Sequence, residues 1–160
     1  MNDKLLKIYL NDHLAGSMAG LELAKRCCSS NEGTPLGDFL ERLIEEIEGD
    51  KSALEELMDT LGAPKDPVKQ LAAWAGEKLG RLKMNGQLTG YSDLSRLEEL
   101  EGLSLGVEGK LSLWRSLNEV ADHDSRLATT DLDGLMSKAR KQREDLEVHR
   151  LEAASKALAS

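Results

Sequence analysis

The sequence predicts an all-α protein, built as a four-helix bundle with one additional short helix. Strands draw on aromatic and β-branched residues, and this 160-residue chain holds only two Trp, two Tyr and one Phe. Apolar residues instead recur every three or four positions in five segments, which capping residues, proline or glycine separate. The length suits one helical-bundle domain over residues 1–160.

A short polar turn separates the first two segments. The first helix is predicted at about 3–28 and ends at the stretch SSNEG. Thr34 and Pro35 then supply an N-cap and a first helical position, so the second helix is predicted at about 35–61. Gly62 ends that helix.

The third segment is shorter and lies between two long ones. Asp66 and Pro67 repeat the combination of cap and proline, which predicts a helix at about 67–83. At roughly 1.5 Å per residue, this helix and its flanking loops can travel most of the length of a bundle. Such a crossover makes the second and third long helices run parallel.

The last two segments are long. Ser92 caps a helix that reaches about Ala121, and Thr130 with Asp133 resembles a capping box that opens the last helix at about 131–158. In the helix that Ser92 caps, the stretch EGLSLGVEGKLSLW carries apolar residues on two nearly opposite faces, one of them rich in glycine. We expect that glycine face to admit either the crossover helix or a second subunit, so a homodimer through a helix face is consistent with the sequence.

Two helices, a long crossover and two further helices resemble the ferritin-like superfamily, especially its small bacterial stress-related bundles. The resemblance covers the whole chain and implies a di-iron site. Two helices of that site each supply a Glu, and the other two each supply a Glu-x-x-His pair. The sequence departs from this pattern, because Glu22 faces outward and the second helix has no Glu-x-x-His. Glu147 and His149 are two positions apart and point about 200° apart.

Helical spacing instead directs a different set of ionisable side chains inward. The set is His13, Glu46, Asp50, Glu101, Glu108, Arg143 and Arg150. If the third and fourth long helices are antiparallel, Glu108 is level with Arg143 and Glu101 with Arg150. A guanidinium cannot ligate a metal but pairs well with carboxylates. We therefore expect a buried polar network that fixes helix register in place of a complete di-iron site.

The alternative interpretation is a modified metal site. Iron or manganese would be held by His13, Glu46, Asp50 and Glu108, with Arg143 behind the ligands. Burying these charges without partners would cost several kcal/mol each. Both the polar network and the metal site would give the buried charges partners, so burial alone does not distinguish the two interpretations.

Composition excludes several classes of function. The net charge of −8 argues against binding to nucleic acid or to anionic membranes. No apolar run approaches the roughly 20 residues that span a bilayer, and the charged N-terminus does not fit a signal peptide, so a cytoplasmic protein is expected. Cys27 and Cys28 are adjacent and are expected to be free thiols.

The segment 63–91 is basic, with a net charge of +3. Trp74, Lys78 and Arg81 lie along one edge of the predicted helix 67–83, where an anion or an acidic partner could bind. The alternative is that this helix packs its apolar face onto an acidic bundle and pairs its charges locally.

The sequence contains no Ser-His-Asp set, nucleophilic Cys-His pair or phosphate-binding loop. We therefore expect a non-catalytic structural or interaction protein without a cofactor, and the family resemblance implies a link to stress responses. The alternative function is that of an iron- or manganese-binding carboxylate protein.

Overall fold

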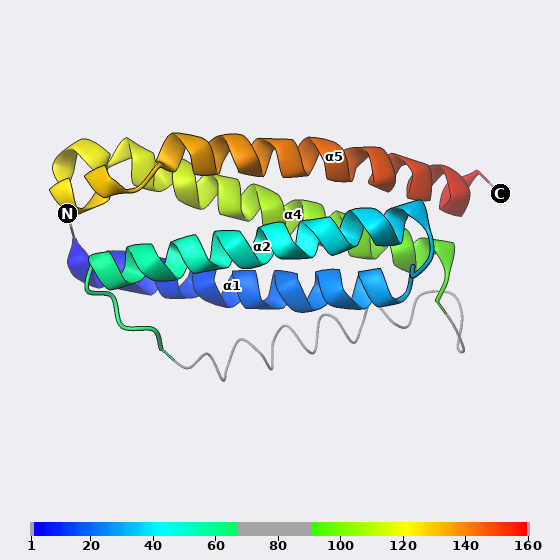
Figure 1. The fold of residues 1–160 in the computed structure, drawn as a ribbon, viewed down its shortest axis with the longest axis horizontal. Coiled ribbons are helices and arrows are strands. Elements are labelled where there is room, and N and C mark those ends of the chain that lie inside the picture. Colours follow the sequence, from blue (N-terminus) through cyan, green and yellow to red (C-terminus); the bar gives the residue numbers. More distant parts are fainter. Residues whose placement is uncertain (1, 67–90, 160) are drawn as a thin grey trace.

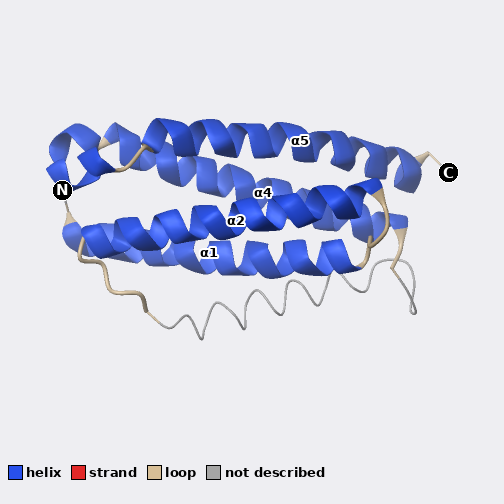
Figure 2. Ribbon diagram, viewed as in Figure 1, coloured by secondary structure: helices blue, strands red, loops and turns tan. Residues whose placement is uncertain are grey.

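Four long helices make up most of the part of the chain that the computed structural model describes, residues 2–66 and 91–159 (Figures 1 and 2). They are α1 (Asp3–Ser29), α2 (Pro35–Thr60), α4 (Asp93–Glu119) and α5 (Leu132–Leu158), with the 3₁₀ helices η1 (Ala121–His123) and η2 (Ser125–Thr129) before α5. These ranges contain no strand, which confirms the all-α prediction. The predicted helix 67–83 lies outside the described residues.

The two ends of α2 follow the sequence signals closely. The hydroxyl of Thr34 accepts a hydrogen bond from the amide of Gly37 at 3.1 Å, and Pro35 is the first helical residue. Gly62, with φ 62°, follows the last turn in the left-handed conformation that ends helices. The predicted cap and terminator are therefore both confirmed.

The start of α5 differs from the prediction by one residue. Asp131, rather than Thr130, is the N-cap, because its carboxylate accepts a 2.9 Å hydrogen bond from the amide of Gly134. Thr130 instead ends the preceding 3₁₀ helix η2, which the sequence pattern did not reveal. The α4 cap is as predicted, since Ser92 accepts a hydrogen bond from the amide of Ser95.

The helices form two antiparallel hairpins, α1 with α2 and α4 with α5 (Figure 1). Helices α2 and α4 run in the same direction, because the first halves of both contribute to one apolar cluster and the second halves of both to another. Helix α4 packs against both α1 and α5, whereas α2 packs mainly on α1 and touches α5 little. The chain between residues 61 and 92 therefore joins opposite ends of the bundle.

The core is divided into two apolar clusters along the bundle axis. One cluster, centred on Leu57, Leu111 and Trp114, fills the end where the chain begins. The other, centred on Leu40 and Leu100, fills the opposite end. The buried polar side chains of α2 and α5 lie in α-helical segments between these clusters, at the middle of the bundle.

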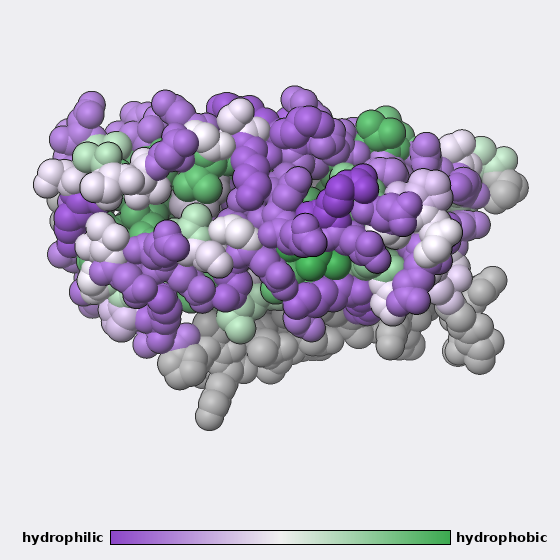
Figure 3. Space-filling view, viewed as in Figure 1, coloured by the Kyte–Doolittle hydropathy of each residue, from purple (hydrophilic) through white to green (hydrophobic). Residues whose placement is uncertain are grey.

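The surface seen in Figure 3 is largely hydrophilic, with separate apolar patches. The most exposed large apolar side chains include Leu105 on α4 and Leu158 on α5, which are 75% and 71% exposed. Among the described helices, none combines the length and the apolar character that crossing a membrane requires.

Candidate functional site

Asp50 is the buried carboxylate at the middle of α2. It is 4% exposed and lies in the apolar stripe that also holds Ile47, Leu54 and Leu57. Because residues three, four and seven positions apart share one face of a helix, the same spacing that buries the leucines turns Asp50 into the bundle. Its burial agrees with the inward position expected from the sequence.

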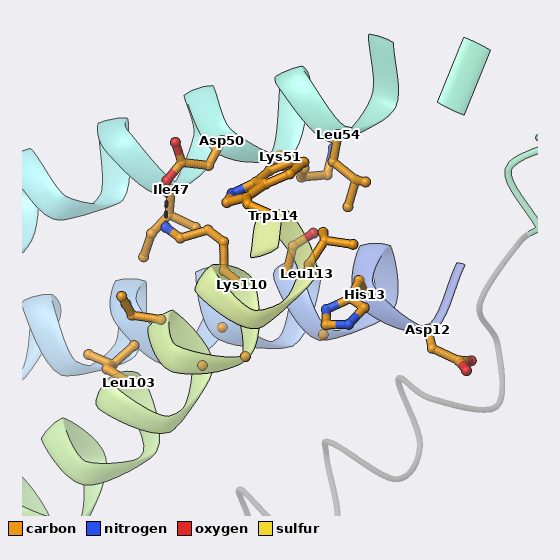
Figure 4. Close-up of a pocket in the computed structure, with 16 residues that line it drawn as sticks. Asp12, His13, Ile47, Asp50, Lys51, Leu54, Leu103, Lys110, Leu113 and Trp114 are labelled. Atoms are coloured by element: carbon orange, nitrogen blue, oxygen red, sulfur yellow. Dashed lines mark hydrogen bonds and ion pairs between the residues drawn. The ribbon is translucent and has the colours of Figure 1, made fainter. Parts of the chain in front are cut away.

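Three side chains from the other hairpin surround the Asp50 carboxylate. Lys110 Nζ on α4 lies 2.5 Å from Asp50 Oδ2 and also donates to Gln142 Oε1 on α5. Gln142 Nε2 donates to the same Asp50 Oδ2 at 2.9 Å, which closes a ring of three mutual interactions. Lys138 Nζ lies 3.0 Å from the other oxygen, Oδ1. We call these four residues the Asp50 cluster, and Figure 4 shows its Asp50–Lys110 contact.

The partners of Asp50 stabilise the charged form of its carboxylate. Burial acts to raise the pKa of Asp50, but the charge and hydrogen bond of Lys110, with hydrogen bonds from Gln142 and Lys138, outweigh it. The pKa of Asp50 therefore lies below its ordinary value. Burial also lowers the pKa of the Lys110 ammonium, an effect that the facing Asp50 opposes. The carboxylate is thus held in its ionised form by the three side chains that donate to it.

Lys110, Lys138 and Gln142, the three partners of Asp50, were not predicted from the sequence. Lys110 belongs to the glycine-rich stretch of α4, where a lysine is ordinarily solvated, yet its side chain is only 16% exposed. Gln142 occupies the buried stripe of α5 with Ala139 and Leu146, whereas the prediction placed Arg143 there. The spacing 139, 142, 146 was the available signal, and the adjacent arginine obscured it.

The remaining predicted residues lie apart from Asp50. Glu108 pairs with Arg143 and, at 3.2 Å, with Arg115, but the two side chains of the predicted pair are 38% and 47% exposed. Arg150 lies 3.5 Å from Glu101. The structure thus brings both predicted pairs together, but it places them at the surface rather than in the interior. Their long side chains reach one another around the rim of the α4–α5 contact while their charged groups keep contact with water.

Arg150 also contacts its own helix. Its Nε and Nη2 atoms each lie 2.7 Å from the Glu147 carboxylate, one turn earlier on α5. This local bidentate pair is shorter than the 3.5 Å contact with Glu101 on α4. Arg150 therefore contributes more to order within α5 than to the register between helices.

Glu46 and His13 also depart from the prediction. The Glu46 side chain is exposed, and only its backbone carbonyl meets the cluster, at 3.4 Å from Lys138 Nζ. His13 is half-buried and stacks edge-on against Tyr9 of its own helix at a centroid distance of 4.6 Å. Burial lowers the pKa of His13, although the nearby Asp12 acts to raise it.

The residues do not fit the metal site implied by the family resemblance. Within the described ranges, no group of three or more His, Cys, Asp or Glu side chains is positioned to hold a metal ion. Both Asp50 oxygens face lysine ammonium groups, whose positive charge opposes a second cation, and Glu108 pairs with two arginines. The four proposed ligands His13, Glu46, Asp50 and Glu108 are therefore not assembled.

A second polar cluster, absent from the sequence predictions, lies near the α1–α2 turn. Glu99 on α4 is 5% exposed, and its Oε1 accepts a 2.8 Å hydrogen bond from Arg26 on α1. Asn31 donates to the Tyr91 hydroxyl at 3.0 Å and accepts from Arg96 at 2.8 Å. Glu99 lies four positions before Leu103 on the buried face of α4, so the helical spacing carried this signal too.

A cavity of about 180 Å³ lies beside the Asp50 cluster, between α1, α2 and α4 (Figure 4). Its wall includes His13, Asp50, Lys110 and Trp114 together with glycines and aliphatic residues. The predicted surface residues Trp74, Lys78 and Arg81 lie outside the described residues.

Comparisons of this chain with protein-family models, with curated proteins and with solved structures gave no match. The geometry of the described residues therefore carries the functional argument.

Proposed function

We propose that this chain is a non-catalytic, ferritin-like helical bundle that serves as a structural or interaction protein. In this proposal, the Asp50 cluster stands in place of a complete di-iron site and fixes how the helices pair. The same-direction run of α2 and α4 supports the ferritin-like topology, since an alternating bundle would make these helices antiparallel. The resemblance further suggests a role in stress responses.

One observation carries the proposal: a single buried carboxylate on α2 meets Lys110 on α4 and Gln142 on α5. Buried polar groups of this kind can specify register, because any slip leaves them without partners. A slip of α5 by one residue would turn Gln142 about 100° away from Asp50. Three helices are thus tied to one axial position.

The free thiols support a cytoplasmic location. Cys27 is buried, Cys28 is partly buried, and neither forms a disulfide. Unpaired cysteines suit a reducing compartment, where thiols stay reduced.

The register role can be tested by replacing Asp50, Lys110 and Gln142 together. A variant with Asp50→Leu, Lys110→Met and Gln142→Leu should keep its helix content and its melting temperature, since apolar replacement of buried ion pairs is often neutral or stabilising. It should lose unique packing, seen as broadened amide resonances and increased binding of a hydrophobic dye. A triple variant with sharp, native-like resonances would show that the network does not fix the pairing.

Metal analysis tests the same proposal against its alternative. Purified protein titrated with iron(II) or manganese(II) should show no stoichiometric binding. Stoichiometric binding that disappears on His13→Ala or Asp50→Ala would overturn the proposal in favour of a metal-binding protein.

The proposal includes a homodimer formed through a helix face. Leu105 on α4 is 75% exposed and stands beside Gly106 and Gly109, which carry no side chain to hold a partner helix away. Light scattering over a range of concentrations should show a dimer, and Leu105→Glu should convert it to a monomer. A strictly monomeric wild-type protein would contradict this part of the proposal.

A further inference from the structure

The seam between α2 and α5 is the open side of the bundle. Helix α2 packs mainly on α1 and touches α5 little, whereas α5 packs extensively on α4. Two solvent-open hollows of about 410 and 290 Å³ lie along the seam, on either side of the Asp50 cluster. Lys138 crosses the seam between them to reach Asp50 and the backbone oxygen of Glu46. We call the two hollows together the α2–α5 groove, which residues 39–60 and 129–149 form.

The groove offers apolar surface that a partner can reach. Val148 lines the smaller hollow and is 58% exposed. Ala53 and Leu135 line the larger hollow, and both are half-buried. Leu135 and Val148 are 13 positions apart on α5, which is roughly 20 Å at 1.5 Å per residue. A helix lying lengthwise in the groove would therefore contact both hollows with one apolar face.

The α2 wall of the groove carries most of the negative charge of the chain. Helix α2 contains nine Asp or Glu residues and two Lys or Arg residues, a net charge of −7 in a chain of −8. Its neighbours do not compensate, because α1 has four basic and three acidic residues and α5 has six basic and five acidic residues. Each neighbour is therefore only +1. A partner of positive charge is favoured on this side of the bundle.

The larger hollow is the more acidic of the two. Glu56 and Asp131 both line it and are exposed, while the third charged group there, Lys138, is held by Asp50. In the smaller hollow, Arg42 stands beside Glu46, and Asp145 pairs with Lys141. A basic side chain of a partner thus fits the larger hollow, and an apolar side chain fits the smaller one beside Val148.

The same charges select among occupants. A second copy of the chain seated on its own α2 would bring together two helices of −7, and like charges across an interface cost binding free energy. Nucleic acid and anionic membranes are repelled for the same reason. Grooves between packed helices commonly receive an amphipathic helix, anchored by apolar residues at helical spacing.

We propose that the α2–α5 groove docks a basic amphipathic helix of a partner protein. The apolar face of that helix packs on Ala53, Leu135 and Val148, and a Lys or Arg enters the larger hollow beside Glu56 and Asp131. This inference rests on the interaction role proposed above and names the surface and the partner chemistry for it. The surface is separate from the Leu105 side of α4 through which the homodimer is proposed.

Nuclear magnetic resonance of the full chain tests the docking with synthetic peptides. The probe is a peptide of about 20 residues, with Leu at helical spacing and Lys elsewhere, which is long enough to cover both hollows. It should shift the amide signals of Ala53, Gly134 and Val148 saturably. A peptide of identical composition with Leu and Lys in alternating order, and one with Glu in place of Lys, should each bind at least tenfold more weakly. Equal binding of either control, or shifts centred on α1 or α4, would overturn the proposal.

One pair of variants tests the charge. Glu56→Lys places a cation in the larger hollow and should weaken binding of the Leu–Lys helix about fivefold, as loss and reversal of an exposed ion pair predict. The matched control is Glu119→Lys, which makes the same change of charge at an exposed position near the end of α4. It should change the affinity less than about twofold. Equal losses in both variants would show that the peptide follows net charge rather than the groove.

A second pair tests the apolar contact. Val148 and Leu151 are similarly exposed on α5, at 58% and 55%, but only Val148 lines the smaller hollow. Val148→Ser should weaken binding roughly fivefold, the loss expected when about half of a valine side chain is covered. Leu151→Ser should bind like the wild type, and equal losses in the two would place the peptide outside the groove. None of these outcomes changes the metal titration or the triple variant of the Asp50 cluster, so failure of docking and failure of the structural proposal remain distinguishable.

Discussion

Gln142 Nε2 on α5 donates a 2.9 Å hydrogen bond to Asp50 Oδ2 on α2, across 92 positions of sequence. Both residues are nearly inaccessible, at 2% and 4% exposure. The two helices otherwise pack little against each other apart from the ring contact of Phe39 with His149, so this bond and the Lys138–Asp50 ion pair join them at the middle of the bundle. The centre of the bundle is therefore held by polar chemistry rather than by apolar packing.

Removing the Asp50 carboxylate should be costly. Asp50→Ala leaves the Lys110 ammonium buried without its counter-charge, and breaking a buried pair typically costs about 3–5 kcal/mol. Urea denaturation followed by circular dichroism measures this loss of unfolding free energy. The control is Glu46→Ala, which changes an exposed side chain one turn away and should cost under about 0.5 kcal/mol. Similar losses of unfolding free energy in both variants would show that Asp50 and Lys110 do not form a buried pair in solution.

Acid should destabilise the fold through Asp50. Its pKa is lowered in the folded state, so its contribution is fully present above its ordinary unfolded value of about 3.9. That contribution is lost as pH falls through the lower folded value. Melting temperatures between about pH 5 and pH 2 should therefore fall more steeply for the wild type than for Asp50→Asn, which cannot titrate. Parallel curves would show that Asp50 is not responsible.

The adjacent cysteines should differ in reactivity. Burial raises the pKa of Cys27 to about 12, despite the opposing effect of its hydrogen bond with Tyr91. Its thiolate fraction near pH 8 should then be roughly a thousandfold below that of an ordinary thiol. In a thiol–disulfide exchange assay, the Cys28→Ser variant should react very slowly and the Cys27→Ser variant much faster, because Cys28 is partly exposed. Equal rates would show that burial does not protect the Cys27 thiol from reaction.

Gly37 should not tolerate a side chain. A Cβ atom there would lie 2.4 Å from the backbone oxygen of Asn31, so the α1–α2 turn would have to move. Gly37→Ala is expected to cost more than about 2 kcal/mol, as strained core substitutions do. Gly49→Ala on the same helix is the matched control, since its Cβ would meet Lys138 Nζ at an ordinary 3.6 Å. That control should gain up to about 1 kcal/mol.

The surface pair of Glu108 and Arg143 should contribute little. Both side chains are more than one-third exposed, and exposed pairs are typically worth 0–1 kcal/mol. Chemical denaturation of Arg143→Ala and Glu108→Ala should show losses of at most about 1 kcal/mol. A double-mutant cycle measures the pair directly, and a coupling above about 2 kcal/mol would mean that the pair is buried in solution.

Sequence reasoning recovered the four long helices of the described residues because caps and terminators act locally. The signals at Thr34, Gly62 and Ser92 each concern hydrogen bonds within a few residues, and all three match the structure. The start of α5 was missed by one residue because Thr130 and Asp131 are both good caps, and the neighbouring 3₁₀ helix decides between them.

The polar centre was harder to predict, for a geometric reason. Asp50 lies among leucines at unambiguous spacing, so its burial followed from periodicity. Gln142 and Arg143 are neighbours on a polar helix, and a rotation of 100° separates the buried from the exposed position. Periodicity with few apolar markers cannot fix that angle. The burial of Lys110 depends on the Asp50 carboxylate on another helix. The spacing of residues along α4 does not reveal such a tertiary contact.

The crossing of the chain between the two hairpins has a consequence for assembly. A short turn joins α1 to α2, and the 3₁₀ helices η1 and η2 lie between α4 and α5. Residues 61–92 connect the first hairpin to the second. Because the two hairpins belong to one chain, the effective concentration of one hairpin at the other is high. The Asp50 cluster and the Arg26–Glu99 hydrogen bond both join one hairpin to the other. The bundle is thus equivalent to a heterodimer of hairpins that happens to be encoded in one polypeptide.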